Sequence, residues 1–223
     1  MNIKESISQF LEGKEKNRGR FPDTRSTSFD YCYNYFYSFY KENRLAELVN
    51  DKNIQMSCLQ LGFYLASWGM IRGSSFLLRK SILHYKNLII AISKMDPQLW
   101  EIDVPNYNEE NIKILLRCKQ QIKNALGEEN NPSETLVTKI MLGVFANVPA
   151  LDQYFKKSLN VSSVNQKSLL KIKEFYKQNK IDFDSFKIYT YDFLTSKETK
   201  VAYTKAKLID MAGVMDGSTK NYG

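Results

Sequence analysis

Residues 53–95 read NIQMSCLQLGFYLASWGMIRGSSFLLRKSILHYKNLIIAISKM, and we expect the rest of the chain to fold around this stretch. No charged side chain occurs from Asn53 to Ile71. Apolar side chains recur there every three or four residues, as on one face of a helix: Ile54, Cys58, Leu61, Leu65 and Trp68. The other side of the helix carries Met56, Leu59, Phe63 and Tyr64. A helix that is apolar nearly all round is typical of burial among several neighbours, so we expect it at the centre of the core.

A membrane-spanning helix is the alternative for the same segment, since the uncharged run is close to the minimum length of a span, about 17–20 residues. Four polar side chains interrupt the run, and no comparable second span follows: Gln55, Ser57, Gln60 and Ser67. We therefore favour a core helix and expect no membrane association.

Gly69 and Gly73 lie on either side of Arg72. Glycines weaken helical preference, so we expect the first helix to break or kink here, and the second half of the stretch begins after this point. Ser74 can cap a new helix. Beyond it, apolar residues again follow helical spacing: Leu78, Ile82, Tyr85, Ile89 and Ile92. Residues 53–95 are therefore expected to form a kinked helical hairpin.

The composition favours a single compact α-helical domain. The chain has 223 residues, of which 43% are hydrophobic and 25% charged, and it contains only ten glycines and five prolines. Turn-rich β folds use more of both residues. No linker rich in proline, glycine or serine divides the chain, and only Phe183–Leu194, which alternates in part, predicts a short β segment.

Other helices follow from apolar spacing and capping residues. They are expected at Ile3–Leu11, at Phe29–Tyr40, from Asn108 to Gly127, from a cap at Asn131 through Leu136–Phe145, at Ser163–Gln178 and at Val201–Ala212, ending at Gly213. Residues 13–28 are expected to be a loose basic loop, and residues 216–223 a flexible tail.

The segment Phe29–Tyr40 contains eight aromatic residues in twelve. One helical stripe of these rings is expected to pack on the central helices. The other, which holds Tyr31 and Tyr35, is open to two interpretations: tyrosines at the core boundary, or a surface that stacks on nucleobases.

The formal net charge is +8, and most of it lies late in the chain. Lys156–Lys207 holds twelve lysines against five acidic residues, an excess of seven positive charges. Such a segment suits an anionic partner, and nucleic acid is the partner we expect; the alternative is that the lysines only keep the protein soluble. The sequence leaves self-association open.

The cysteines indicate a reducing compartment. Cys32, Cys58 and Cys118 are odd in number and widely spaced, and each lies on an apolar helical face, so they are expected as reduced core residues. The amino terminus carries no apolar run behind a basic start. We expect a cytoplasmic protein, and the richness in Lys, Asn, Ile, Tyr and Phe suggests an AT-rich bacterial genome.

Several kinds of catalytic site are excluded by the residues present. His84 is the one histidine, so catalytic triads and paired-histidine metal sites are ruled out, and we expect His84 to be a packing or surface residue. The glycine-rich phosphate-binding and dinucleotide-binding motifs are absent. We expect neither a metal nor a cofactor.

Cationic side chains mark two candidate ligand sites. The first is the loop from Lys14 to Ser28, with Lys14, Lys16, Arg18, Arg20 and Arg25, where guanidinium groups suit phosphate or carboxylate; a solvated loop is the alternative. The second is Arg72 beside Trp68. An arginine within so apolar a stretch needs a partner, which is a core carboxylate such as Asp30 or Asp152, or the anion of a ligand.

A candidate catalytic pair lies in Thr138–Phe145 and Val148–Asp152, which form a helix, a short turn with Pro149, and an aspartate. This arrangement resembles the late part of the helix-hairpin-helix DNA glycosylase superfamily. The resemblance implies that Asp152 is a catalytic acid, with Lys139 beside it, although the G-x-G hairpin of that family is missing before Lys139. The segments around 29–40, 65–78 and 138–155 also look like those of an uncharacterised bacterial family, which implies no function.

Two functions are therefore compared. The leading interpretation is an α-helical binding protein, without catalysis, whose basic segment Lys156–Lys207 contacts nucleic acid without sequence preference. The alternative is a glycosylase-like enzyme that acts on DNA through Asp152. The observation that best separates these interpretations is whether the structure has a concave site that holds Arg72, Lys139 and Asp152 together.

Overall fold

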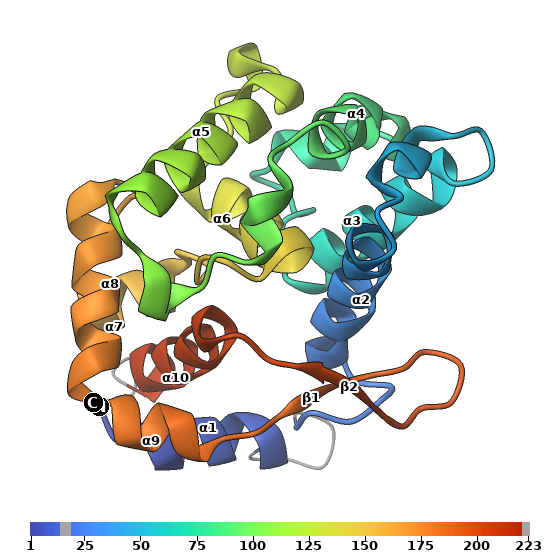
Figure 1. Ribbon diagram of the computed structural model, residues 1–223. Helices are drawn as coiled ribbons and strands as arrows, with labels where there is room; N and C mark the ends of the chain where they lie inside the picture. Colours follow the sequence, from blue (N-terminus) through green and yellow to red (C-terminus); the bar gives the residue numbers. More distant parts are fainter. Residues whose placement is uncertain (14–18, 220–223) are drawn as a thin grey trace.

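The computed structural model describes residues 1–13 and 19–219. Helices dominate this part of the chain, and one two-stranded antiparallel sheet accompanies them, so the prediction of an all-α fold with a short β segment is confirmed (Figure 1). The α-helices are α1 Ile3–Glu12, α2 Ser28–Lys41, α3 Ile54–Ser67, α4 Lys86–Ile92, α5 Glu109–Leu126, α6 Glu134–Phe145, α7 Gln153–Leu159, α8 Gln166–Gln178, α9 Lys180–Ser185 and α10 Lys205–Thr219. The strands are β1 Tyr189–Tyr191 and β2 Glu198–Ala202.

Helix α6 lies at the centre of the core, with α2, α3 and α5 packed against it. All residues from Leu136 to Phe145 are buried. Gly143 lets α3 approach closely, since a Cβ at that position would lie 2.3 Å from the ring of Tyr64. The expectation that α3 is the central helix is therefore wrong: α3 covers one side of α6.

Helix α3 is buried on one side only. Leu61 and Leu65 are inaccessible to solvent, but Met56, Leu59 and Phe63 are exposed, and Phe63 retains 69% of its surface. The prediction of burial all round fails because neighbours pack on one face alone. The outer face remains apolar and uncovered.

The second arm of the predicted hairpin is broken into three short pieces, of which η4 (Ile82–Tyr85) and α4 pack back on α3. Two 3₁₀ turns, η3 (Phe76–Arg79) and η4, precede α4. Lys80 and Ser81 between them are extended, with ψ of 142° and 171°. A continuous helix from Ser74 is therefore excluded, and Leu78, predicted to face inward, is exposed.

Helix α2 places its aromatic residues as two internal surfaces. Phe29, Tyr33 and Phe36 are buried in the core. On the second stripe, the Tyr35 hydroxyl lies 2.9 Å from Ser57 Oγ, and Tyr31 donates a hydrogen bond to the carbonyl of Pro22. The second stripe thus meets the protein itself, as a core boundary does.

Helix caps follow local residue chemistry. Asn108 caps α5 by accepting the Asn111 amide, as predicted. Helix α6 is capped by Ser133 rather than by Asn131, whose φ of +45° places it in the left-handed region. Ser133 accepts the Leu136 amide, so the helix starts two residues later than the proline suggested.

The C-terminal segment departs most from prediction. Residues 201 and 202 belong to β2, which pairs with β1 in a hairpin beside α2 (Figure 1). Helix α10 starts at Lys205 and continues to Thr219, so Gly213 does not end it and residues 216–219 are not a loose tail. Gly213 and Gly217 face α7, where a Cβ would lie 2.5 Å from the Phe155 ring and 2.1 Å from the Tyr154 carbonyl oxygen.

The cysteines are free and buried, as expected. Burial raises the pKa of the Cys58 thiol and raises those of Cys32 and Cys118 further. Within residues 1–13 and 19–219, no helix is both long and apolar enough to cross a bilayer.

Glu134 joins three elements at the start of α6 and gives a testable pH dependence. Burial alone would raise its pKa, but Lys119 Nζ at 2.7 Å, the Val164 amide at 3.0 Å and Lys123 Nζ at 3.1 Å bring the pKa below its usual value. A lowered folded-state pKa means that this stabilisation is present above the unfolded pKa of about 4.3 and is lost as the pH falls through the folded pKa.

The variant Glu134→Gln should therefore lose about 2 kcal/mol of unfolding free energy at pH 7, as expected for hydrogen bonds to a charged group. Its stability should also decline less than that of the wild type below about pH 4.3. Urea unfolding at pH 7 and at low pH measures both effects. Parallel pH profiles for the two proteins would contradict this account.

Candidate functional site: a cationic pocket around Trp68

A pocket of about 800 Å³ opens between the turn after α3, the start of α6 and the start of α7. Its polar and charged lining includes four cationic side chains and one carboxylate. These residues are Arg25, Arg72, Lys139, Lys156 and Asp152. Trp68 and Tyr154 add aromatic surface to the same pocket.

Lys139 and Asp152 meet in this pocket. Lys139 comes from the buried helix α6 and is only 2% exposed, whereas Asp152 is the N-cap of α7. Lys139 Nζ lies 3.4 Å from Asp152 Oδ2. The other oxygen, Oδ1, accepts the amides of Tyr154 and Phe155 at 3.0 and 2.9 Å. Capping therefore occupies one carboxylate oxygen and leaves the second facing the lysine.

The turn that leads to Asp152 is fixed from two sides. Ala146 ends α6 with φ of +53°, a left-handed conformation that a non-glycine residue adopts only where its surroundings enforce it. Thr138 Oγ1 accepts the Leu151 amide at 2.8 Å, and Asp210 Oδ1 accepts the Ala150 amide at 3.1 Å. Helices α6 and α10 thus hold the position of Asp152.

Trp68 lies among three cations. Lys139 Nζ is 4.6 Å from the ring centroid, Arg25 Cζ is 5.3 Å away and Lys207 Nζ is 5.5 Å away. A cation near an aromatic face is attracted by the ring quadrupole. The indole is only partly buried, so Trp68 belongs to the pocket wall rather than to the deep core in which it was predicted.

Lys207 also lies beside the pocket, although it was not among the predicted site residues. Its ammonium is buried, and burial lowers its pKa although Asp210 Oδ2, at 3.2 Å, acts in the opposite direction. Lys207 Nζ also lies 4.6 Å from the Phe29 ring. In the sequence this lysine is one of many in a basic segment. The only local signal that distinguishes it is Asp210, three residues later, which can pair with it on the same helix.

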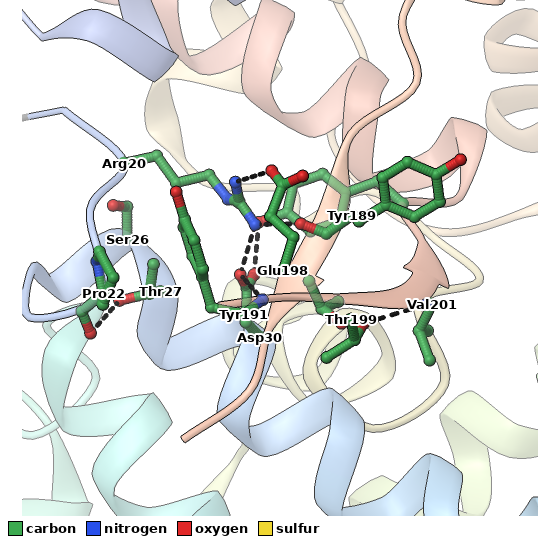
Figure 2. Close-up of polar contacts among 12 residues, drawn as sticks. Arg20, Pro22, Ser26, Thr27, Asp30, Tyr189, Tyr191, Glu198, Thr199 and Val201 are labelled. Carbon is green, nitrogen blue, oxygen red and sulfur yellow. Dashed lines mark hydrogen bonds and ion pairs between the residues drawn. The ribbon is translucent and has the colours of Figure 1, made fainter. Parts of the chain in front are cut away.

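Arg20 lies outside the pocket, in a buried network of its own. Figure 2 shows its guanidinium beside the ring of Tyr191 and between the carboxylates of Asp30 and Glu198. Arg20 Nη2 is 2.7 Å from Asp30 Oδ2, and Nε donates to the Tyr203 hydroxyl at 2.7 Å. Burial raises the pKa of Asp30, while Arg20 acts to lower it. The role expected for Arg20, an anion contact in a loose loop, is wrong.

The structure brings most of the predicted site residues together. Arg25, Trp68, Arg72, Lys139 and Asp152 line one pocket. Arg18, with Lys14 and Lys16, lies outside the described residues. Arg72 is exposed rather than buried, and both carboxylates proposed as its partner pair elsewhere: Asp30 with Arg20, and Asp152 with Lys139.

The basic C-terminal segment is less free than its composition suggests. Several of its lysines have internal partners: Lys173 donates to the Tyr107 carbonyl, Lys205 pairs with Asp184, Lys207 with Asp210, and Lys177 with Glu174. Lys156 is the one residue of this segment that lines the pocket. The described residues contain no group of three or more His, Cys, Asp or Glu side chains suited to a metal ion.

No protein-family model, curated protein or solved structure matches the chain. The pocket residues themselves are therefore the basis for a functional proposal.

Proposed function

We propose that the protein binds nucleic acid and that one nucleotide unit enters the pocket around Trp68. The observation that carries this proposal is the convergence of four cations, from four separate parts of the chain, on one pocket with an aromatic wall. Phosphate is attracted by clustered lysine and arginine, and a base can stack on an aromatic ring. The pocket supplies both interactions in one place.

The roles within the pocket differ with exposure. Arg72 is exposed and Lys156 partly exposed, so both can contact phosphate at the pocket mouth. Lys139 is deeply buried and held beside Asp152, so it meets only a group that enters the pocket. The indole of Trp68 offers a surface for a base or sugar between the cations at the pocket mouth and the buried Lys139.

Oligonucleotide binding tests the proposal. Labelled single-stranded and duplex oligonucleotides, titrated at low salt, should bind, and the affinity should fall steeply as salt rises. The double variant Arg72→Ala/Lys156→Ala should bind more weakly, with the slope of log affinity against log salt reduced by about 2, one for each phosphate contact.

Lys167→Ala is the matched control, because Lys167 is an exposed lysine of the same basic segment outside the pocket. Equal losses in both variants would assign binding to general charge. Absence of binding at low salt would leave solubility as the role of the lysines.

Tryptophan fluorescence gives a separate readout of pocket entry. The chain has two tryptophans, and Trp100 is buried with its Nε1 bonded to the Val144 carbonyl at 3.0 Å. Quenching on addition of a short oligonucleotide should therefore come from Trp68. The variant Trp68→Phe should abolish the quench, and a quench that persists would place the nucleotide elsewhere.

A second candidate function is cleavage of a base from its sugar, as the resemblance to the helix-hairpin-helix glycosylases implies. The observation that favours it is the pair of Lys139 Nζ and Asp152 Oδ2 within a pocket open to a ligand. A carboxylate can stabilise the positive charge that develops on the sugar when its bond to the base breaks. Incubation with DNA carrying damaged bases would detect this reaction as base release.

A further inference from the structure

A second surface of the protein carries exposed aliphatic and aromatic side chains. Met56, Leu59 and Phe63 follow one face of α3, and Ile82 and Leu83 lie on η4. The two elements pack together at Gly62, where a Cβ would lie 3.8 Å from Ile82 Cγ2. Phe63 and Leu83 are 69% and 68% exposed. We name these five residues the α3–η4 face.

The segment that carries this face has only positive charges of its own, and Glu129, from the turn after α5, acts electrostatically on His84 of η4. Residues 52–95 contain no aspartate or glutamate, but they contain Lys52, Arg72, Arg79, Lys80, Lys86 and Lys94. Each of these six cations is exposed, and none forms an ion pair within residues 1–13 and 19–219. Arg79 ends η3, Lys80 follows it before η4, and Lys86 directly follows η4. Elsewhere cations such as Arg44 and Lys113 do meet carboxylates, so the absence here is a property of this surface.

We propose that the α3–η4 face is a docking site for an amphipathic helix of another protein, with aliphatic residues on one side and acidic residues beside them. Met56, Leu59 and Phe63 stand at i, i+3 and i+7, the spacing by which one helix packs on another. The partner's apolar stripe covers these side chains and Ile82 with Leu83. Its carboxylates meet Arg79, Lys80 and Lys86.

Charge and surface chemistry favour this occupant over two others. A second copy of the chain would bring the same patch against itself in a two-fold dimer, so Arg79, Lys80 and Lys86 would face the same cations of the other copy. Nucleic acid would satisfy the cations but leave the aliphatic side chains in water, since base stacking uses aromatic rings. The proposal is independent of the pocket, because none of the five residues lines it.

Peptide binding to the full-length protein tests the proposal. The probe is a fluorescent synthetic helix with leucines at helical spacing and glutamates flanking them, and its control is the same peptide with lysines in place of the glutamates. The acidic peptide should bind and the basic peptide should not. The variant Phe63→Ser/Leu83→Ser should weaken binding at least about tenfold, as truncation of apolar anchors does.

The variant Arg79→Glu/Lys80→Glu should weaken binding of the acidic peptide by about tenfold and reverse the preference toward the basic one. Ile181→Ser and Lys167→Glu are the matched controls, since both residues are exposed on other elements, and both should bind like the wild type. Undiminished binding in the α3–η4 variants would overturn the proposal. A different occupant would also overturn it. In that case the acidic peptide does not bind, and the wild-type protein binds phosphatidylserine vesicles or duplex DNA while the α3–η4 variants do not.

Discussion

Replacing Asp30 with alanine is expected to lower the free energy of unfolding by about 3–5 kcal/mol, because removal of one partner leaves a buried charge without compensation. The side chains of Asp30 and Arg20 are 0% and 3% exposed. Asp30 also accepts hydrogen bonds from the Tyr191 amide, at 2.9 Å, and from the Tyr203 hydroxyl. The carboxylate thus joins α2 to the residue-20 segment, to β1 and to the approach to α10.

Urea unfolding of Asp30→Ala beside Glu198→Gln measures this effect. Glu198 also pairs with Arg20, at 3.7 Å, but its side chain is half exposed, so its replacement should cost no more than about 1 kcal/mol. A double variant, Arg20→Met/Asp30→Leu, should regain part of the lost stability, since it removes both charges together. Wild-type stability in Asp30→Ala would show that water or another group compensates Arg20.

The second large effect is expected at Asp152, in an assay of base release from damaged DNA. If the second candidate function holds, Asp152→Asn should reduce release by at least about 100-fold, the scale on which positioned catalytic groups act. Asparagine caps helices about as well as aspartate, so the hydrogen bonds to Tyr154 and Phe155 can be kept. The change therefore removes the charge beside Lys139 while it preserves the start of α7.

Asp103→Asn is the matched control for Asp152→Asn. Asp103 is also an N-cap, accepts the Lys205 and Ala206 amides at 2.7 and 2.8 Å, and lies outside the pocket. It should lose stability without loss of base release. If Asp152→Asn loses only stability and the wild type releases no base, then Asp152 is a cap and a partner of Lys139, and nucleotide binding alone remains.

Local residue patterns were sufficient for most of the helices. The aromatic spacing of Phe29–Tyr40 and the cap at Asn108 depend on neighbours within one or two turns, and both appear in the structure as expected. Lys139 and Asp152 were named together from the resemblance to the helix-hairpin-helix glycosylases, and they are in contact because they stand on either side of one short turn. Their ion pair is a contact between residues only thirteen positions apart.

The C-terminal strand pair shows where local patterns were insufficient. Residues 198–202 form β2 because β1 lies beside them and because the Tyr203 amide bonds back to the Ile188 carbonyl at 2.8 Å. From the sequence, Val201 and Ala202 were expected at the start of a helix instead. Helix α10 then begins at Lys205, where Asp103, about a hundred residues earlier, accepts its first amides.

By itself the sequence determined which segments are apolar, where most of the helices lie, and that the chain is rich in lysine, because periodicity, capping and charge are properties of neighbouring residues. Only the tertiary structure decided that Trp68 and Arg72 share a pocket with Asp152, that Arg20 is buried against Asp30, and that one apolar face of α3 stays open. Burial and pairing depend on which distant elements arrive beside a residue. An apolar stripe looks the same in the sequence whether another helix covers it or solvent does.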